Sequence, residues 1–214
     1  MAARNNKRAL KIIRTLHTRQ KKQADKIDII CRDMVTAHRE FATKLAKLTF
    51  VTSFYESLLQ SDDLADLLDA AVWGIREAVT GADTAVFLLA ENGFDVHVAD
   101  AGISDPVEKR EFQHWFTREL VSSVSQMNRV CSLEKLLKMG LQGPPAILKT
   151  ISIAAIPLGR LGQGIGFVLV YRPAHLPLQA EELSRVAAIS VGLRAAIESF
   201  QESPTKPCNT SLQR

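Results

Sequence analysis

Three cysteines and five histidines are the side chains in this sequence best suited to redox, nucleophilic or metal chemistry. Cys31, Cys131 and Cys208 lie far apart and form no Cys-x-x-Cys pair, so the sequence indicates neither a thiol redox motif nor a disulfide framework. Metal-ligand spacing is missing among the histidines, which are His17, His38, His97, His114 and His175. We therefore expect no metal site and no cofactor.

The glycine-rich stretch 159–166 is the other candidate for chemistry, because glycine loops can hold phosphates. It lies between two apolar runs, 151–158 and 165–171, where a hairpin between antiparallel strands explains it. The sequence contains no Walker motif and no nucleophile elbow. We predict a protein without catalytic residues.

The chain has 214 residues, enough for one ordinary domain and an additional element, and 46% of them are hydrophobic. Its net charge of +4 is unevenly distributed. Residues 1–26 hold nine basic side chains and one acidic one, a net charge of +8, which leaves −4 for the remainder. Apolar runs are far shorter than the ~20 residues of a membrane-spanning helix, and the scattered cysteines suit a reducing compartment. We expect a cytoplasmic protein.

Residues 1–60 contain neither proline nor glycine and carry an apolar repeat of seven residues. Two series, starting at Ile13 and Leu16, give fourteen positions, and the polar ones are Gln20, Gln23 and Lys44. A coiled coil is predicted, because a lone helix of about 70 Å cannot bury such a stripe. The alternative is a single amphipathic helix lying on its own domain. The predicted homodimer has a seam of Ile13, Leu16, Ile27, Ile30, Met34, Phe41, Leu48, Val51, Tyr55 and Leu58.

The basic segment before this seam leaves two further partners open. Clustered Lys and Arg attract the phosphates of nucleic acids, and they also attract an anionic membrane surface. A basic segment leading into a dimeric coiled coil is the layout of bZIP proteins, but residues 4–9 lack the basic-region pattern of Asn, paired Ala and Arg. A solvated helix face is the remaining interpretation.

Residues 61–200 begin with a helix and a hairpin pattern. Ser61-Asp62-Asp63 is predicted to cap a helix over 64–79, which Gly81 ends. Thr84–Ala90 and the alternating residues 94–98 flank an Asn-Gly turn signal and predict a β-hairpin, with His97 facing away from the core.

The following residues predict further helices and three more strands. A helix is expected to start at 105–108, with an apolar face made of Phe112, Trp115, Phe116 and Leu120. A short strand at 129–131, a short helix at 132–139 and a loop at 143–145 follow. Strands at 151–158 and 165–171 precede a helix over 179–200, and 201–214 is predicted to be a disordered tail. The predicted organisation is thus a basic arm and coiled coil (1–60), one domain (61–200) and a tail.

The order of these elements and several short sequences resemble a GAF domain. Ala155-Ile156-Pro157-Leu158 is similar to a strand that reads Ile-Pro-Leu in that family, and 166–172 is similar to the Gly-x-Leu strand after it. Glu181-Glu182-Leu183 and Ala195-Ala196-Ile197-Glu198 resemble parts of the terminal helix. The resemblance covers residues 60–200 and rests on order and spacing.

The resemblance implies an α+β, PAS-related fold with a central antiparallel sheet of about five or six strands and helices on both faces. The 64–79 helix and the last helix would cover one face, and the segment 103–149 would cover the other. In GAF relatives a ligand sits under that second cover. The matching pocket residues are Phe87, Phe112, Trp115, Phe116, Arg129 and Cys131. The alternative is that these side chains fill the space without a ligand.

Two ligand classes known in GAF relatives do not fit this sequence. A histidine usually follows the cysteine that attaches a bilin, whereas Ser132 follows Cys131, which we expect to be a small buried hydrophobe. The Asn-Lys…Phe…Asp-Glu signature of cyclic-nucleotide binders is missing. The resemblance implies a sensor that binds an unidentified small molecule or a protein and acts on a partner protein. A structural dimerisation adaptor and a nucleic-acid-binding dimer remain the alternatives.

Overall fold

The computed structural model describes residues 2–98, 114–160 and 162–202, with side chains from Leu16 onward except Arg160. The chain divides into two compact units, Met1–Leu48 and Thr49–Arg214. The predicted helix start at 105–108 and nearly all of the predicted tail lie outside the described residues. The second unit begins inside the first helix and not at residue 61, where we had predicted the domain to begin.

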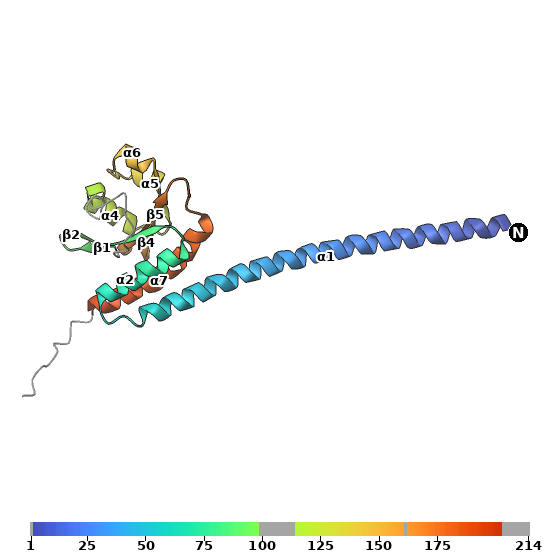
Figure 1. The fold of residues 1–214 in the computed structure, drawn as a ribbon, viewed down its shortest axis with the longest axis horizontal. Coiled ribbons are helices and arrows are strands. Elements are labelled where there is room, and N and C mark those ends of the chain that lie inside the picture. Colours follow the sequence, from blue (N-terminus) through green and yellow to red (C-terminus); the bar gives the residue numbers. More distant parts are fainter. Residues whose placement is uncertain (1, 99–113, 161, 203–214) are drawn as a thin grey trace, which may run out of the picture. The chain divides into compact units, whose positions relative to one another are not determined.

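The first unit is one uninterrupted helix, which is the greater part of α1 (Ala2–Leu58) (Figure 1). The lack of proline and glycine in this region removes the residues that most often break a helix. The long N-terminal helix predicted from the sequence is confirmed.

The second unit is built on a five-stranded antiparallel sheet in the order β2-β1-β5-β4-β3. The strands are β1 (Asp83–Ala90), β2 (Gly93–His97), β3 (Cys131–Ser132), β4 (Ile151–Arg160) and β5 (Gln163–Pro173). The Asn-Gly signal lies at the β1–β2 turn, where Ala90 pairs with Gly93. The antiparallel sheet of the predicted α+β fold is confirmed.

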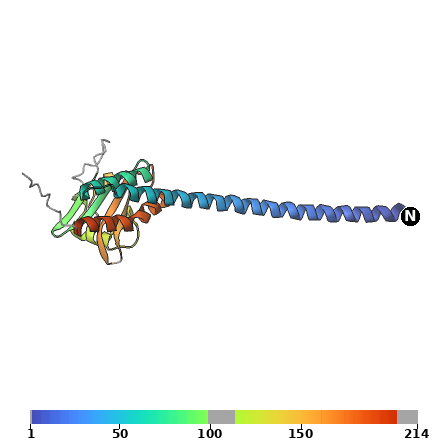
Figure 2. The ribbon, with the colours of Figure 1, turned by 90° about the horizontal axis from the view of Figure 1, so that it is seen from below.

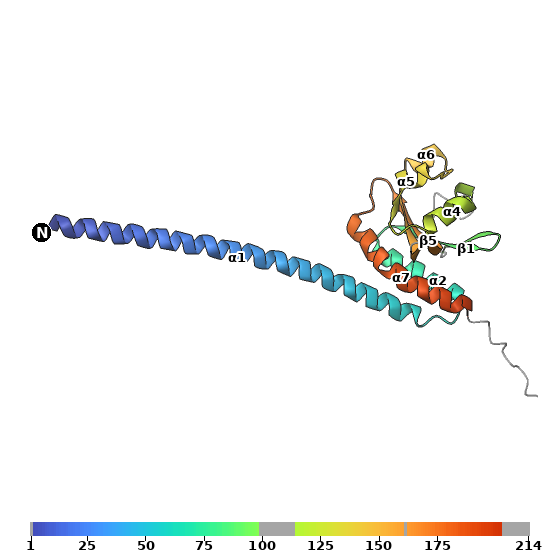
Figure 3. The same ribbon diagram turned by 180° about the vertical axis from the view of Figure 1, so that it is seen from behind.

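Helices lie on both faces of this sheet, as the resemblance implied (Figure 3). One face carries α2 (Leu64–Ala78) and α7 (Ala180–Glu202), which lie side by side in Figure 2. The other face carries α4 (Arg118–Ser125), α5 (Leu133–Lys138) and α6 (Pro145–Leu148). The side chain of Asp63 caps α2 by accepting a hydrogen bond of 2.8 Å from the amide of Asp66.

Successive side chains of each strand point to opposite faces of the sheet, and this creates two separate hydrophobic cores. On β1, Val86 and Leu88 enter the core beneath α2 and α7, whereas Ala85 and Phe87 enter the core beneath α4. The three central strands, β1, β5 and β4, are buried on both faces, which explains their continuous apolar sequences.

Three local predictions need correction. Trp115 and Phe116 do not share a helix with Leu120, because Thr117 caps the separate helix α4. The predicted loop at 143–145 gives way at Pro145 to the short helix α6. His97 was predicted to face away from the core, but it lies half-buried on the α2 side of the sheet, where its Nε2 contacts Asp69 Oδ1 at 2.8 Å.

Candidate functional site

The face under α4 holds a cluster of aromatic rings from three parts of the chain. Phe87 on β1 pairs with Phe167 on β5, and their rings stack with centroids 4.6 Å apart. Phe116, just before α4, places its ring centroid 4.7 Å from Phe87 and 5.6 Å from Phe167. Phe94 of β2 adds a fourth ring at 5.8 Å from Phe87. These spacings are those of aromatic rings in direct contact.

The structure brings together four of the six predicted pocket residues. Phe87, Trp115, Phe116 and Cys131 are all buried in the core under α4. Arg129 is exposed, because it lies in the turn between α4 and β3, and it does not line this core. Phe112 lies outside the described residues.

Cys131 is a buried thiol at the edge of the aromatic cluster. Its Sγ lies 3.2 Å from Met127 Sδ and 3.6 Å from the carbonyl oxygen of Arg129. Burial raises the pKa of the Cys131 thiol, and the nearby charge of Lys135 only partly opposes this. The protonated thiol is a poor nucleophile, so Cys131 is here a packing residue.

The second candidate surface is the apolar face of α1. Met34 is 70% exposed and Phe41 is 64% exposed, although such side chains are normally buried. The predicted seam residues that are exposed in the same way are Leu16, Ile27, Ile30 and Leu48, while the side chain of Ile13 is not among those described. This row exceeds the single exposed apolar residues that are normal on a protein surface.

The predicted seam does not continue to its last members. Leu58 is buried in the core with α2 and α7, and Val51 and Tyr55 pack against the same core. Phe54, which lies between these positions, is also buried in this core and is only 3% exposed. The end of α1 is thus part of its own domain, as the alternative interpretation had it, and only the residues up to Leu48 remain for a partner.

Two glycines allow the end of α1 to approach its neighbours closely. A Cβ on Gly74 of α2 would lie 2.8 Å from Cδ2 of Phe54, and a Cβ on Gly192 of α7 would overlap the ring of Tyr55. The Tyr55 hydroxyl also lies 3.5 Å from the carbonyl oxygen of Ile189. We call these contacts of α1 with α2 and α7 the junction.

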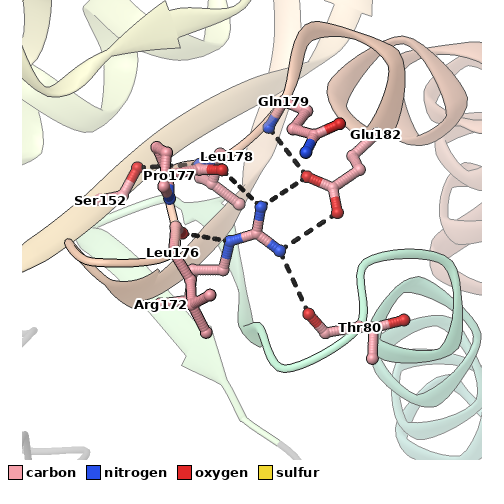
Figure 4. A network of polar contacts seen from close by, with 8 residues as sticks. All are labelled: Thr80, Ser152, Arg172, Leu176, Pro177, Leu178, Gln179 and Glu182. Atoms are coloured by element: carbon pink, nitrogen blue, oxygen red, sulfur yellow. Dashed lines mark hydrogen bonds and ion pairs between the residues drawn. The ribbon is translucent and has the colours of Figure 1, made fainter.

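A buried arginine, which our sequence reasoning did not identify, joins β5 to the start of α7 (Figure 4). Arg172 is 6% exposed and forms a two-pronged ion pair with Glu182, at 3.1 and 2.7 Å. Its remaining N–H groups donate to the backbone carbonyl oxygens of Thr80, Leu176 and Pro177. All donor groups of the guanidinium are thereby used, so this is a structural network and not a free anion site.

Glu182 is held in its ionised form by the same network. Burial would raise its pKa, but the backbone N–H of Gln179 and the Arg172 guanidinium outweigh burial and lower the pKa below its usual value. The Gln179 N–H lies 2.8 Å from Glu182 Oε2 at the start of α7. A carboxylate at a helix N-terminus is also favoured by the helix dipole.

The described part of the chain brings together no group of three His, Cys, Asp or Glu side chains that could hold a metal ion. Among the described helices, none is both long and apolar enough to span a bilayer. The features that remain for function are the aromatic cluster, the junction and the exposed face of α1.

No protein-family model and no curated protein matches this sequence. Solved structures do match. The GAF domain of an Acinetobacter phosphoenolpyruvate-protein phosphotransferase is 15% identical with a TM-score of 0.54, over 73% of this chain and 95% of that one. The corresponding domain from Coxiella burnetii is 13% identical with a TM-score of 0.56, over 72% and 94%.

A third match is the chromophore-binding domain of the Stigmatella aurantiaca bacteriophytochrome, in its Thr289His mutant form. It is 14% identical with a TM-score of 0.51, over 72% of this chain and 60% of that one. At such identities the likeness concerns the fold. Together with the sheet order and the helices on its two faces, it shows that the chain carries a domain with the GAF fold, preceded by a long N-terminal helix.

Proposed function

We propose that this chain is a non-enzymatic, cytoplasmic signal-transduction protein that forms a homodimer through α1. Its GAF-fold domain would detect a small molecule or a protein and pass the change to a partner protein through α1. The observation that carries the proposal is the junction, where the end of α1 is buried between α2 and α7. A shift of either helix would therefore move α1.

The exposed apolar face of α1 supports the dimer. A second copy offers the same face, and pairing of two such helices buries both stripes at once. Support for a small-molecule ligand comes from the fold, because one structural relative is a chromophore-binding domain. The buried, protonated Cys131 supports a role without covalent catalysis.

A structural adaptor is the second candidate, and the aromatic cluster favours it. Phe87, Phe116 and Phe167 are each at most 3% exposed and contact one another, so these three rings fill the space between them. In this case the domain would have a structural role in the dimer without binding a ligand, and α1 would not respond to one.

Native mass spectrometry of the purified protein, with a thermal-shift screen of nucleotides and metabolites, separates the two candidates. A sensor is expected to retain a ligand or to gain several degrees in Tm with one compound, because a ligand that binds the folded state stabilises it. A ligand-free mass and a flat screen would favour the adaptor.

The dimer is tested by placing charge in the apolar face of α1. Met34→Glu with Phe41→Glu is expected to convert the dimer to a monomer in analytical ultracentrifugation, because buried unpaired carboxylates are costly. Thr36→Glu with Thr43→Glu is the matched control, since both threonines are exposed, also seven residues apart, and outside the seam. A wild-type chain that sediments as a monomer at micromolar concentration would refute the dimer.

A further inference from the structure

The residues that flank the exposed face of α1 carry a charge pattern that the dimer proposal does not use. If Ile27 is assigned to heptad position a and Ile30 to d, the g positions beside the seam are Arg19, Lys26, Asp33, Glu40 and Lys47. The first four side chains are exposed on α1, whereas Lys47 is half-buried. The four exposed ones are two basic residues followed by two acidic ones. The residues at e and g are those that set partner choice and orientation in coiled coils.

The other flank of the seam is almost uncharged. The e positions in the same stretch are His17, Ala24, Cys31, His38 and Leu45. In a parallel dimer, g of one helix lies beside e of the other, so the four charges at g would meet only neutral side chains or histidine. In an antiparallel dimer, g lies beside g and e beside e.

We propose, resting on the dimer proposed above, that two copies of α1 pair antiparallel, with Arg19 beside the partner's Glu40 and Lys26 beside the partner's Asp33. Both pairs occur in the same antiparallel alignment. Along one flank of two antiparallel helices, the numbers of facing residues always add up to the same value, and they do so for these two pairs. The two-fold axis repeats them, which gives four complementary contacts. Two basic g residues followed by two acidic g residues are complementary to those of a second copy only when that copy runs in the opposite direction.

The same register also pairs apolar residues across the seam. It places Ile27 against the partner's Ile30 and Phe41 against the partner's Leu16, and these side chains are exposed in the single chain. On the neutral flank, Cys31 lies beside the partner's Ala24, also an e position. A parallel pair would instead place Lys44, at a d position, against the partner's Lys44.

The overall charge of the helix favours the same direction. Residues 1–26 have a net charge of +8, whereas residues 27–48, with four basic and three acidic side chains, have a net charge of +1. Parallel pairing in register would place the two +8 segments side by side, where like charges repel each other. Antiparallel pairing places each of them beside a nearly neutral segment of the partner.

The orientation is measured with a nitroxide spin label at Ala46→Cys in the full-length chain, with Cys31→Ser and Cys208→Ser to remove other reactive thiols. Ala46 is exposed and lies outside the seam. In the antiparallel register the two labels are separated by about 50 Å along the helix axis. In a parallel dimer the separation is about 20 Å, set by the distance between helix axes and the label arms.

Charge exchange tests the pairs themselves. One variant carries Arg19→Glu and Lys26→Glu, and the other carries Asp33→Lys and Glu40→Lys. Each alone would align four like charges at g, so we expect its dimer to dissociate at least tenfold more readily than wild type. An equimolar mixture would restore all four contacts and form a heterodimer with wild-type affinity. Circular dichroism checks that each variant remains folded.

The outcomes separate this inference from the dimer proposal. A dimer in which the two spin labels at position 46 are only about 20 Å apart overturns the antiparallel arrangement and leaves the dimer proposal intact. The same holds if each charge variant dimerises alone as well as the two do when mixed. A monomeric wild-type chain overturns both. A trimer or tetramer in ultracentrifugation overturns the pairing described here as well.

Discussion

Arg172 is the side chain whose surroundings say most about how this domain is held together. Its guanidinium joins Thr80 after α2, the loop at 176–177 and Glu182 at the start of α7. Removal of one partner of a buried ion pair leaves the other charge without compensation, which typically costs about 3–5 kcal/mol. The network thus fixes the start of α7, which in turn packs against the end of α1.

Glu182→Gln should lower the free energy of unfolding at pH 7, and the deficit should shrink in acid. The folded-state pKa of Glu182 is lowered, so its contribution is present above the unfolded pKa of about 4.3 and is lost as the pH falls through the folded pKa. Urea unfolding of both proteins between pH 3 and 7 measures this. Glu181→Gln is the control, because Glu181 is exposed. A deficit that is independent of pH would contradict the assignment.

Cys131 should be almost inert toward thiol reagents in the folded protein. Its burial and raised pKa both limit the population of accessible thiolate, whereas Cys31 is exposed. In a Cys208→Ser variant, Ellman's reagent is expected to label one thiol rapidly and the second only after unfolding. Rapid labelling of two thiols in the native protein would show that Cys131 is accessible.

Among the elements, the close approach of α1, α2 and α7 depends on the two glycines of the junction. Gly192→Ala should destabilise the domain by about 1–3 kcal/mol, because the added Cβ overlaps the Tyr55 ring. This loss would exceed the gain that alanine normally brings to a helix. Thermal and urea unfolding provide the measurement.

A double-mutant cycle identifies the cause of that loss. In a Tyr55→Ala background the same Gly192→Ala substitution should be neutral or stabilising, since the overlapping ring is gone. Gly93→Ala serves as a second control, because a Cβ there meets no atom within 4 Å. Equal losses in both backgrounds would mean that the ring is not responsible.

The elements that sequence could predict are those with local signals. Asp63 caps α2, and the Asn-Gly pair turns the β1–β2 hairpin, because both depend only on nearby residues. The start of α4 was missed, because Trp115, Phe116 and Leu120 have helical spacing even though Thr117 caps a new helix after the first two. The helical spacing of apolar residues does not reveal that one helix ends and another begins between them.

The candidate site was predictable only in part, for a similar reason. The heptad repeat of α1 continues through Leu58, and a stripe that faces a partner helix has the same period as one that faces its own domain. Periodicity therefore could not show where the seam ends. Arg172 was missed because most of its acceptors are backbone carbonyl oxygens, which leave no trace in the sequence.

For the whole molecule, the decisive question is where the domain begins. The compact unit starts at Thr49, and Phe54 and Leu58 contribute directly to the core between α2 and α7. The helix that offers an apolar face to a second copy is therefore continuous with a helix that the domain needs for its own stability. The proposed dimer and the folding of the domain would use different residues of one helix, so the two can be separated by truncation.

A chain of residues 46–214 should be a monomer with a Tm within a few degrees of the full-length protein, because it keeps the junction and loses most of the exposed seam. A chain of residues 61–214 should be unfolded or far less stable. It lacks Phe54 and Leu58, and truncation of a single buried Phe or Leu to Ala already costs about 2–5 kcal/mol. That loss is a large share of the 5–15 kcal/mol typical of whole domains. Circular dichroism melts and sedimentation of the two fragments measure both effects, and equal stability would show that the domain is complete without the end of α1.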